Sequence, residues 1–191
     1  MAEVLLFHHA LGQTTGFLAF AERLRRAGHT VHTPDLYDGR VFDSIDDGVA
    51  FARETGFEKI IERGVASADG LADGLVYCGF SLGVLSAQKL AQTRAGARGA
   101  LLLHGCVPVR MFGPAWPADV PVQIHAMDAD PWFVDEGDLD AARELVASAA
   151  KATLFLYPGS GHLFADSSRP DYDAAAAALL TQRVLDFLAT V

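Results

Sequence analysis

The sequence predicts an α/β fold with a doubly wound, mostly parallel sheet, and two observations support this prediction. Short apolar runs of strand length alternate along the chain with longer stretches of helical periodicity, a pattern typical of parallel strands joined by helices. Most of the short runs are continuously apolar rather than alternating, as in strands that are covered on both faces. The expected strands are residues 4–8, 30–34, 75–80, 99–104, 122–127 and 153–157.

Helices are expected in the segments between these strands. Residues 15–27 place Phe17, Phe20 and Leu24 on one face and end before Gly28, which is a common helix stop. Residues 82–92, 139–150 and 172–189 predict three more helices, and residues 37–71 predict an irregular loop followed by one or two helices. Because no repeat, linker or change of composition divides the chain, residues 1–191 are expected to form a single domain.

The charge and the N-terminal segment restrict the classes of partner. The chain has 15 basic and 24 acidic residues, a formal net charge of −9, and the acidic residues are scattered. This balance argues against nucleic acid and against anionic membranes as partners. The segment MAEVLLFHHA has no basic region, and no apolar run approaches the roughly 18 to 20 residues of a membrane span. We therefore expect a cytoplasmic protein whose two cysteines are free thiols.

The stretch LVYCGFSLGVLSAQKLA, residues 75–91, passes from an apolar strand through Gly-Phe-Ser-Leu-Gly into a helix. In this context the G-x-S-x-G pattern predicts a sharp turn that exposes Ser81 as a nucleophile at the carboxyl end of the sheet. Gly79 and Gly83 would allow the close approach that such a turn requires. The alternative is an ordinary turn in which Ser81 caps the helix. Cys78 lies inside the strand and is expected to be a buried small apolar residue.

A serine nucleophile needs a base and an acid that orients it, and on this fold they follow in the order Asp or Glu, then His. His162 follows the last predicted strand in a glycine-rich loop, while Asp128 and Asp130 follow the preceding one. Asp130 is the favoured acid because it precedes Pro131, which suits a loop just past a strand, whereas Asp128 fits a turn former. Each of these residues taken alone could equally be a polar loop residue.

The negative charge that develops during acyl transfer needs backbone N–H donors. The amide of Leu82, after the serine, and that of Ala10, in the loop after the first strand, are the expected pair. Although His8 and His9 precede Ala10, neighbouring residues of an extended segment point in opposite directions. We therefore expect neither a metal site nor a cofactor.

These residues carry a resemblance to the dienelactone hydrolase family that covers nearly the whole chain. The fragments that carry it are PDLYDGR at 34–40, GFSLG at 79–83, DPWFVDEGDLDAA from 130 and GHLFADSSRPDYDAAAAALLTQRVLDFL from 161. The resemblance implies a compact α/β hydrolase fold without a large lid and without the strands that often precede the first one here. It also implies hydrolysis of lactones and other small carboxylic esters by a triad at Ser81, Asp130 and His162, with oxyanion amides at Ala10 and Leu82.

The chain departs from the family's pattern in three respects. Ser81 stands where the best-known members have a cysteine, and His9 stands where they have a glutamate that holds the resting thiol. Asp166, and Arg40 displaced by one position, stand where arginines grip the carboxylate of dienelactone. An aspartate at that place is expected to repel an anion, so we predict a preference for neutral or cationic esters over the dienelactone anion.

The remaining expectations concern the pocket, the partners and the alternatives. An exposed first edge of the sheet is a candidate contact for a second copy of the chain in a homodimer. Two alternatives stay open, namely a non-catalytic protein that binds a small ligand in the same cleft, and a thioesterase or peptidase. The side chains expected to line the pocket for the small ester or lactone are those of His9, Leu11, Tyr37, Trp132 and Phe133.

Overall fold

The sheet is the centre of the fold in the computed structural model, which describes residues 1–191. Its six strands are all parallel and are ordered β2-β1-β3-β4-β5-β6. The strands are β1 (Glu3–Phe7), β2 (Thr30–His32), β3 (Leu75–Phe80), β4 (Gly99–Leu103), β5 (Val122–Met127) and β6 (Ala152–Tyr157). All six lie within one residue of the predicted positions, except that β2 ends two residues early.

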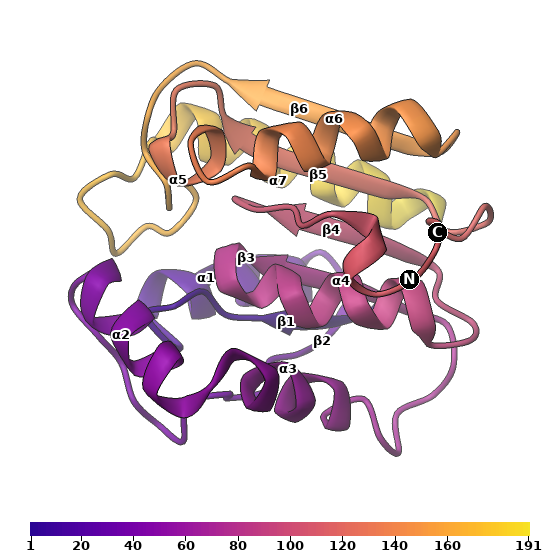
Figure 1. Cartoon of the computed structure of the whole chain (residues 1–191), viewed down its shortest axis with the longest axis horizontal. Helices are drawn as coiled ribbons and strands as arrows, with labels where there is room; N and C mark the ends of the chain where they lie inside the picture. The colour runs from indigo at the N-terminus through magenta and orange to yellow at the C-terminus, as the bar shows by residue number, and fades with distance from the viewer.

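Helices cover both faces of the sheet, as its continuously apolar strands predict. One face packs against α1 and α7 and the other against α2, α3, α4 and α6, so that α3, α4 and α6 lie in front of the sheet in Figure 1 and α1 and α7 behind it. Successive residues of one strand serve the two cores, since Val4 and Leu6 belong to the first and Leu5 and Phe7 to the second. The helices are α1 (Thr15–Arg26), α2 (Ile45–Thr55), α3 (Phe57–Ala66), α4 (Val84–Thr93), α5 (Pro131–Val134), α6 (Asp138–Ser148) and α7 (Ala174–Thr190).

The strand order reverses between β1 and β3. The chain leaves β1 toward β2 on one side and returns to place β3 on the other side. In open α/β sheets such a switch point leaves a crevice at the carboxyl ends of the two strands, and ligands bind there. The segments that begin at this point are the His8–Gly12 loop and the turn at Ser81, which are the two segments in which the sequence predicts chemistry.

Two local features differ from the sequence prediction. A short 3-10 turn, η1 (Ser81–Gly83), precedes α4, so this helix starts at Val84 rather than at Leu82. Pro131 occupies the first position of α5 instead of a loop, and Asp130 caps that helix. Proline suits the first helical position because its missing N–H would have no partner there. No helix combines the length and the apolar character that crossing a bilayer requires.

Candidate active site

Ser81 occupies a strained turn at the carboxyl end of β3. Its φ angle is 48°, in the left-handed region that residues other than glycine rarely adopt. A Cβ atom on Gly79 would lie 2.4 Å from the carbonyl carbon of Gly83, and one on Gly83 would lie 2.5 Å from the carbonyl oxygen of Phe7. Both glycines are therefore needed for the turn to close tightly against β1.

A chain of hydrogen bonds connects Ser81 to two residues from later loops. The Oγ of Ser81 lies 2.8 Å from Nε2 of His162, and Nδ1 of His162 lies 2.7 Å from Oδ2 of Asp130. Because a carboxylate accepts at Nδ1, the ring carries its proton there and leaves Nε2 free to accept the serine hydroxyl hydrogen. Asp130 is fully buried and His162 is 8 % exposed, so little water competes for these bonds.

The α5 turn fixes the acid of this chain. The Oδ1 atom of Asp130 accepts the N–H of Trp132 at 3.0 Å, which leaves Oδ2 for His162. The indole ring of Trp132 lies against the His162 ring, with centroids 5.9 Å apart and a tilt of 38°. Asp128, the other predicted acid, points elsewhere and accepts the N–H of Gly159 at 3.0 Å. The structure thus brings Asp130 rather than Asp128 to the histidine.

The loop after β1 supplies the second predicted N–H donor. The amide of Ala10 donates no hydrogen bond within the chain, while the next amide, that of Leu11, donates to Nδ1 of His9 at 3.2 Å. A Cβ atom on Gly48 would lie 2.1 Å from the carbonyl oxygen of Ala10, so α2 packs directly on this peptide. Leu82 lies in the first turn after Ser81, where helical N–H groups lack partners along the helix.

Asp166 does not face the pocket, and this corrects the prediction that it repels anionic substrates. Its carboxylate has no solvent exposure. It accepts the Nε2 proton of His9 at 2.8 Å, the Ser168 amide at 2.8 Å, the Ser168 hydroxyl at 2.6 Å and the Thr14 hydroxyl. Although burial opposes ionisation, these donors together hold the pKa of Asp166 well below its ordinary value. The Asp166 carboxylate therefore joins its own loop, after β6, to the loop after β1 through these hydrogen bonds.

Four of the five residues expected to line the pocket are fully buried, which corrects that prediction too. His9 packs edge-on against aromatic rings beneath the loop, and Leu11 and Tyr37 also have no exposed side-chain surface. Phe133 faces the core because it lies on the inner side of α5. Trp132, on the outer side, is 37 % exposed and is the one member of the predicted set at the surface.

His8 and His9 bind different partners. The Nδ1–H group of His8 donates to the carbonyl oxygen of His9 at 2.8 Å, and its Nε2 accepts the Leu36 N–H at 3.0 Å. Burial lowers the pKa of His8 to about 4, so the ring is neutral at physiological pH. Arg40, which stands one position from the place of a family arginine, lies over the ring of Phe51, 4.9 Å from its centroid.

Two titratable residues that the sequence did not indicate lie near His162 and Ser81. His104, at the end of β4, is buried with both ring nitrogens unpaired and lies against Phe164, with centroids 4.7 Å apart. Asp138, the first residue of α6, accepts the N–H of Cys106 at 2.8 Å. The signal for His104 was its place as the last residue of the strand predicted over residues 99–104. Asp138 looked like an ordinary acidic residue in the first turn of a helix.

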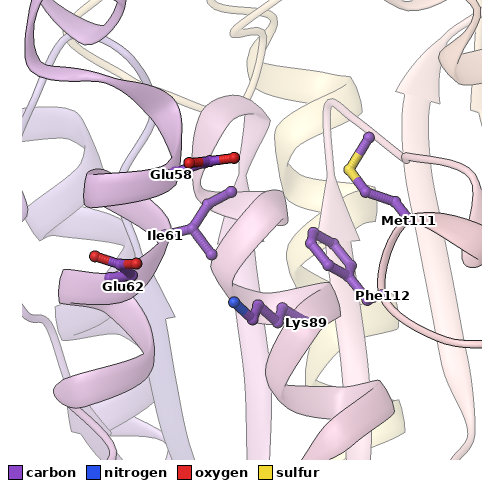
Figure 2. Close-up of a pocket in the computed structure, with 6 residues that line it drawn as sticks. All are labelled: Glu58, Ile61, Glu62, Lys89, Met111 and Phe112. Atoms are coloured by element: carbon purple, nitrogen blue, oxygen red, sulfur yellow. The ribbon is translucent and has the colours of Figure 1, made fainter.

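A surface cleft of about 510 Å³ is lined in part by Trp132, whose indole ring lies against the His162 ring. It is formed by the start of α2 and by the loop before α7. Another pocket, of about 440 Å³, lies between α3, α4 and the turn η2 (Val109–Met111), and no predicted site residue lines it (Figure 2). The lining residues of the first cleft are Asp43, Ser44, Ile45, Asp46, Trp132, Arg169, Pro170 and Asp171.

Three solved structures illustrate how widely this fold occurs. A dienelactone hydrolase-like promiscuous phosphotriesterase from metagenomic libraries is 21 % identical, with a TM-score of 0.75 over 100 % of this chain and 86 % of that one. Dienelactone hydrolase from Anabaena variabilis is 16 % identical, with a TM-score of 0.70 and the same coverage of 100 % and 86 %. A cold-adapted esterase from an Arctic intertidal metagenomic library is 17 % identical, with a TM-score of 0.63 over 95 % and 82 %. At these identities the likeness shows a shared α/β hydrolase fold.

The sequence itself matches a defined family. No curated protein matches the chain significantly. The match to the dienelactone hydrolase family extends over residues 1–191. The chain therefore belongs to the dienelactone hydrolase family and is a hydrolase of the dienelactone hydrolase or esterase type.

Proposed function

We propose that this protein is a serine hydrolase that cleaves small carboxylic esters or lactones through an acyl-enzyme intermediate. The observation that carries the proposal is the unbroken hydrogen-bonded chain from Ser81 through His162 to Asp130 at the carboxyl ends of β3, β5 and β6. This combination of nucleophile, base and orienting acid is the arrangement that activates a serine hydroxyl.

In the first half of the reaction, Nε2 of His162 takes the hydroxyl proton as Oγ of Ser81 attacks the carbonyl carbon. The N–H groups of Ala10 and Leu82 stabilise the negative charge on the carbonyl oxygen. The tetrahedral intermediate collapses by breaking the bond to the alcohol oxygen, which receives the proton from His162. Asp130 stabilises the imidazolium formed between these two proton transfers.

In the second half, His162 takes a proton from water, and the resulting oxygen nucleophile attacks the acyl carbon. The proton then returns to Oγ of Ser81 as the acyl bond breaks and the acid leaves. A lactone follows the same steps, except that its alcohol stays attached to the acyl group until the ring-opened acid is released.

We further propose that neutral and cationic esters are better substrates than the dienelactone anion. Asp166 is buried and cannot cause this preference. The cleft at Trp132 has Asp43, Asp46 and Asp171 against the single cation Arg169, a formal balance of 1 − 3 = −2. Arg169 in turn donates to the Asp43 carbonyl oxygen at 2.6 Å. An anionic substrate therefore meets repulsion at this cleft.

The test is hydrolysis of a panel of activated esters and lactones by the wild type and by Ser81→Ala. We expect turnover of short neutral esters, with kcat/KM lowered by about three orders of magnitude or more in the variant. Ser160→Ala, at an exposed serine in the loop before His162, is the matched control and should stay within twofold of the wild type. Full activity of Ser81→Ala would refute the proposal, and absence of turnover would favour a ligand-binding protein. Efficient turnover of thioesters or peptides alone would favour the other alternative.

A further inference from the structure

Asp138 lies beside the nucleophile without belonging to the hydrogen-bonded chain. Its Oδ2 atom accepts the N–H of Cys106 at 2.8 Å, which fixes the start of α6 against the segment after β4. A Cβ atom on Gly105 would lie 3.3 Å from this Oδ2 and 3.4 Å from the carbonyl oxygen of Ser81. One glycine thus separates the Asp138 carboxylate from the backbone of Ser81.

The hydrogen bonds around His162 leave Asp138 free for another partner. Both ring nitrogens of His162 are occupied, Nδ1 by Asp130 and Nε2 by Ser81. The Oδ1 atom of Asp138 accepts no hydrogen bond from the chain, and no lysine or arginine forms an ion pair with this carboxylate. Because the residue is only half-buried, one carboxylate oxygen remains available to a ligand beside Ser81.

The surroundings of this carboxylate favour contact with a cation. Burial above all, with the charges of Asp130 and Glu136, raises the pKa of Asp138 to about 6, although the Cys106 N–H and the His162 ring act in the opposite direction. A partly desolvated carboxylate without a cationic partner gains more from a positive charge placed next to it than a fully hydrated one does. It equally disfavours a second negative charge at the same place.

We propose that Asp138 is a specificity-determining residue that selects esters whose acyl group carries a positive charge and rejects those whose acyl group carries a negative one. The inference rests on the proposed ester hydrolysis at Ser81. It assigns the acyl side of the site to Asp138, on α6. Asp138 is separate from the acidic cleft at Trp132, which is formed by the start of α2 and the loop before α7. Asp138 thus acts on substrate choice alone, because no atom of it takes part in the proton transfers.

The experiment uses three esters with the same aryl leaving group and the same short acyl chain. They differ only in the group at the far end of the acyl chain. This terminal group is trimethylammonium, its uncharged isostere tert-butyl, or sulfonate, so the charge of each substrate is independent of pH. The quantity compared is kcat/KM for each charged ester divided by kcat/KM for the tert-butyl ester. Because His162 acts on all three esters alike, this ratio removes the pH dependence of the catalytic step itself.

In the wild type we expect the trimethylammonium ratio to rise and the sulfonate ratio to fall as the pH increases through about 6. Asp138→Asn keeps an oxygen for the Cys106 N–H and removes the charge. At pH 8 it should lower the trimethylammonium ratio and raise the sulfonate ratio, each by about fivefold. Asp140→Asn, at an exposed carboxylate in the same helical turn, should leave both ratios unchanged.

Several outcomes would overturn the inference. If the wild type hydrolyses the tert-butyl ester but its two ratios do not depend on pH, Asp138 does not select substrates, although the proposed hydrolase function stands. The wild-type pH profile decides this even if Asp138→Asn fails to fold. Equal ratios in Asp138→Asn and the wild type at pH 8 would lead to the same conclusion. If no ester is hydrolysed at any pH, both the inference and the proposed function fail.

Discussion

The Nε2 atom of His9 lies 2.8 Å from Oδ2 of Asp166, and neither side chain has any solvent exposure. This contact joins the loop after β1 to the loop after β6, between residues 157 positions apart in the chain. The first loop holds the Ala10 amide and the second holds His162 four residues before Asp166. The pair therefore fixes the two sides of the candidate site relative to one another.

Removing the Asp166 charge should destabilise the protein. Asp166→Asn leaves the buried donors around it without their carboxylate, and we expect the free energy of unfolding at pH 7 to fall by about 3 kcal/mol. Chemical denaturation measures this value. Asp186→Asn, at an exposed carboxylate on α7, is the control and should change it by less than about 0.5 kcal/mol. A wild-type value in Asp166→Asn would show that the network contributes no stability.

The lowered pKa of Asp166 should make the free energy of unfolding depend on pH. Folding lowers the pKa of Asp166, so its contribution is fully present above the unfolded-state pKa of about 3.9 and is lost as the pH falls toward the lower folded-state value. The difference in unfolding free energy between the wild type and Asp166→Asn should therefore be constant from pH 7 to 5 and shrink below about pH 4. A difference that grows on acidification would contradict this assignment.

Asp130 and Asp128 should differ sharply in their effect on turnover. Asp130→Asn removes the carboxylate that holds the proton on Nδ1 of His162, and kcat should fall by about 10³ to 10⁴-fold at neutral pH, as in other triads. Asp128→Asn only weakens a turn at Gly159 and should cost less than tenfold. Steady-state kinetics on one neutral ester compares the two variants. Equal losses would mean that the histidine is oriented by some other group.

The turn at Ser81 depends on the absence of a side chain at Gly83. A methyl group there would meet the Phe7 and His8 carbonyl oxygens at 2.5 and 2.7 Å. Gly83→Ala should therefore lower the free energy of unfolding by about 2 kcal/mol and lower esterase activity, since Ser81 must shift. Gly113→Ala is the control, because a methyl group there would meet its nearest atom at 3.6 Å. A Gly83→Ala protein with normal stability and activity would show that the turn accommodates a methyl group despite these short distances.

The strands, and the residues of the hydrogen-bonded chain from Ser81 to Asp130, could be predicted from the sequence because their signals are local. The continuously apolar runs of β3 and β4 identify buried parallel strands, and the G-x-S-x-G pattern fixes Ser81 relative to β3. The geometry also places Asp130, rather than Asp128, next to His162. Pro131 starts a helical turn rather than excluding one, and this turn directs the carboxylate toward His162.

The surroundings of Ser81 and His162 could not be predicted because they depend on contacts between distant segments. Asp166 appeared to face the substrate, since nothing near it in the sequence shows that His9 and Thr14 pack over it. Tyr37 lies on an irregular segment and Phe133 on the four-residue helix α5, and their burial becomes visible only once α2 and α5 are in place. Asp138 is placed beside Ser81 by the packing of α6 on the segment after β4.

The most direct measurement of the central claim is covalent labelling with a fluorophosphonate probe, followed by intact mass and peptide mapping. A serine nucleophile at this position should give one adduct per chain, located on Ser81, and no adduct in Ser81→Ala. It also predicts that iodoacetamide leaves the native protein active, because Cys78 and Cys106 are buried and burial raises the pKa of both thiols well above the ordinary value. Loss of activity on alkylation of Cys78, or a native protein that gains no adduct on Ser81, would show that Ser81 is not the nucleophile.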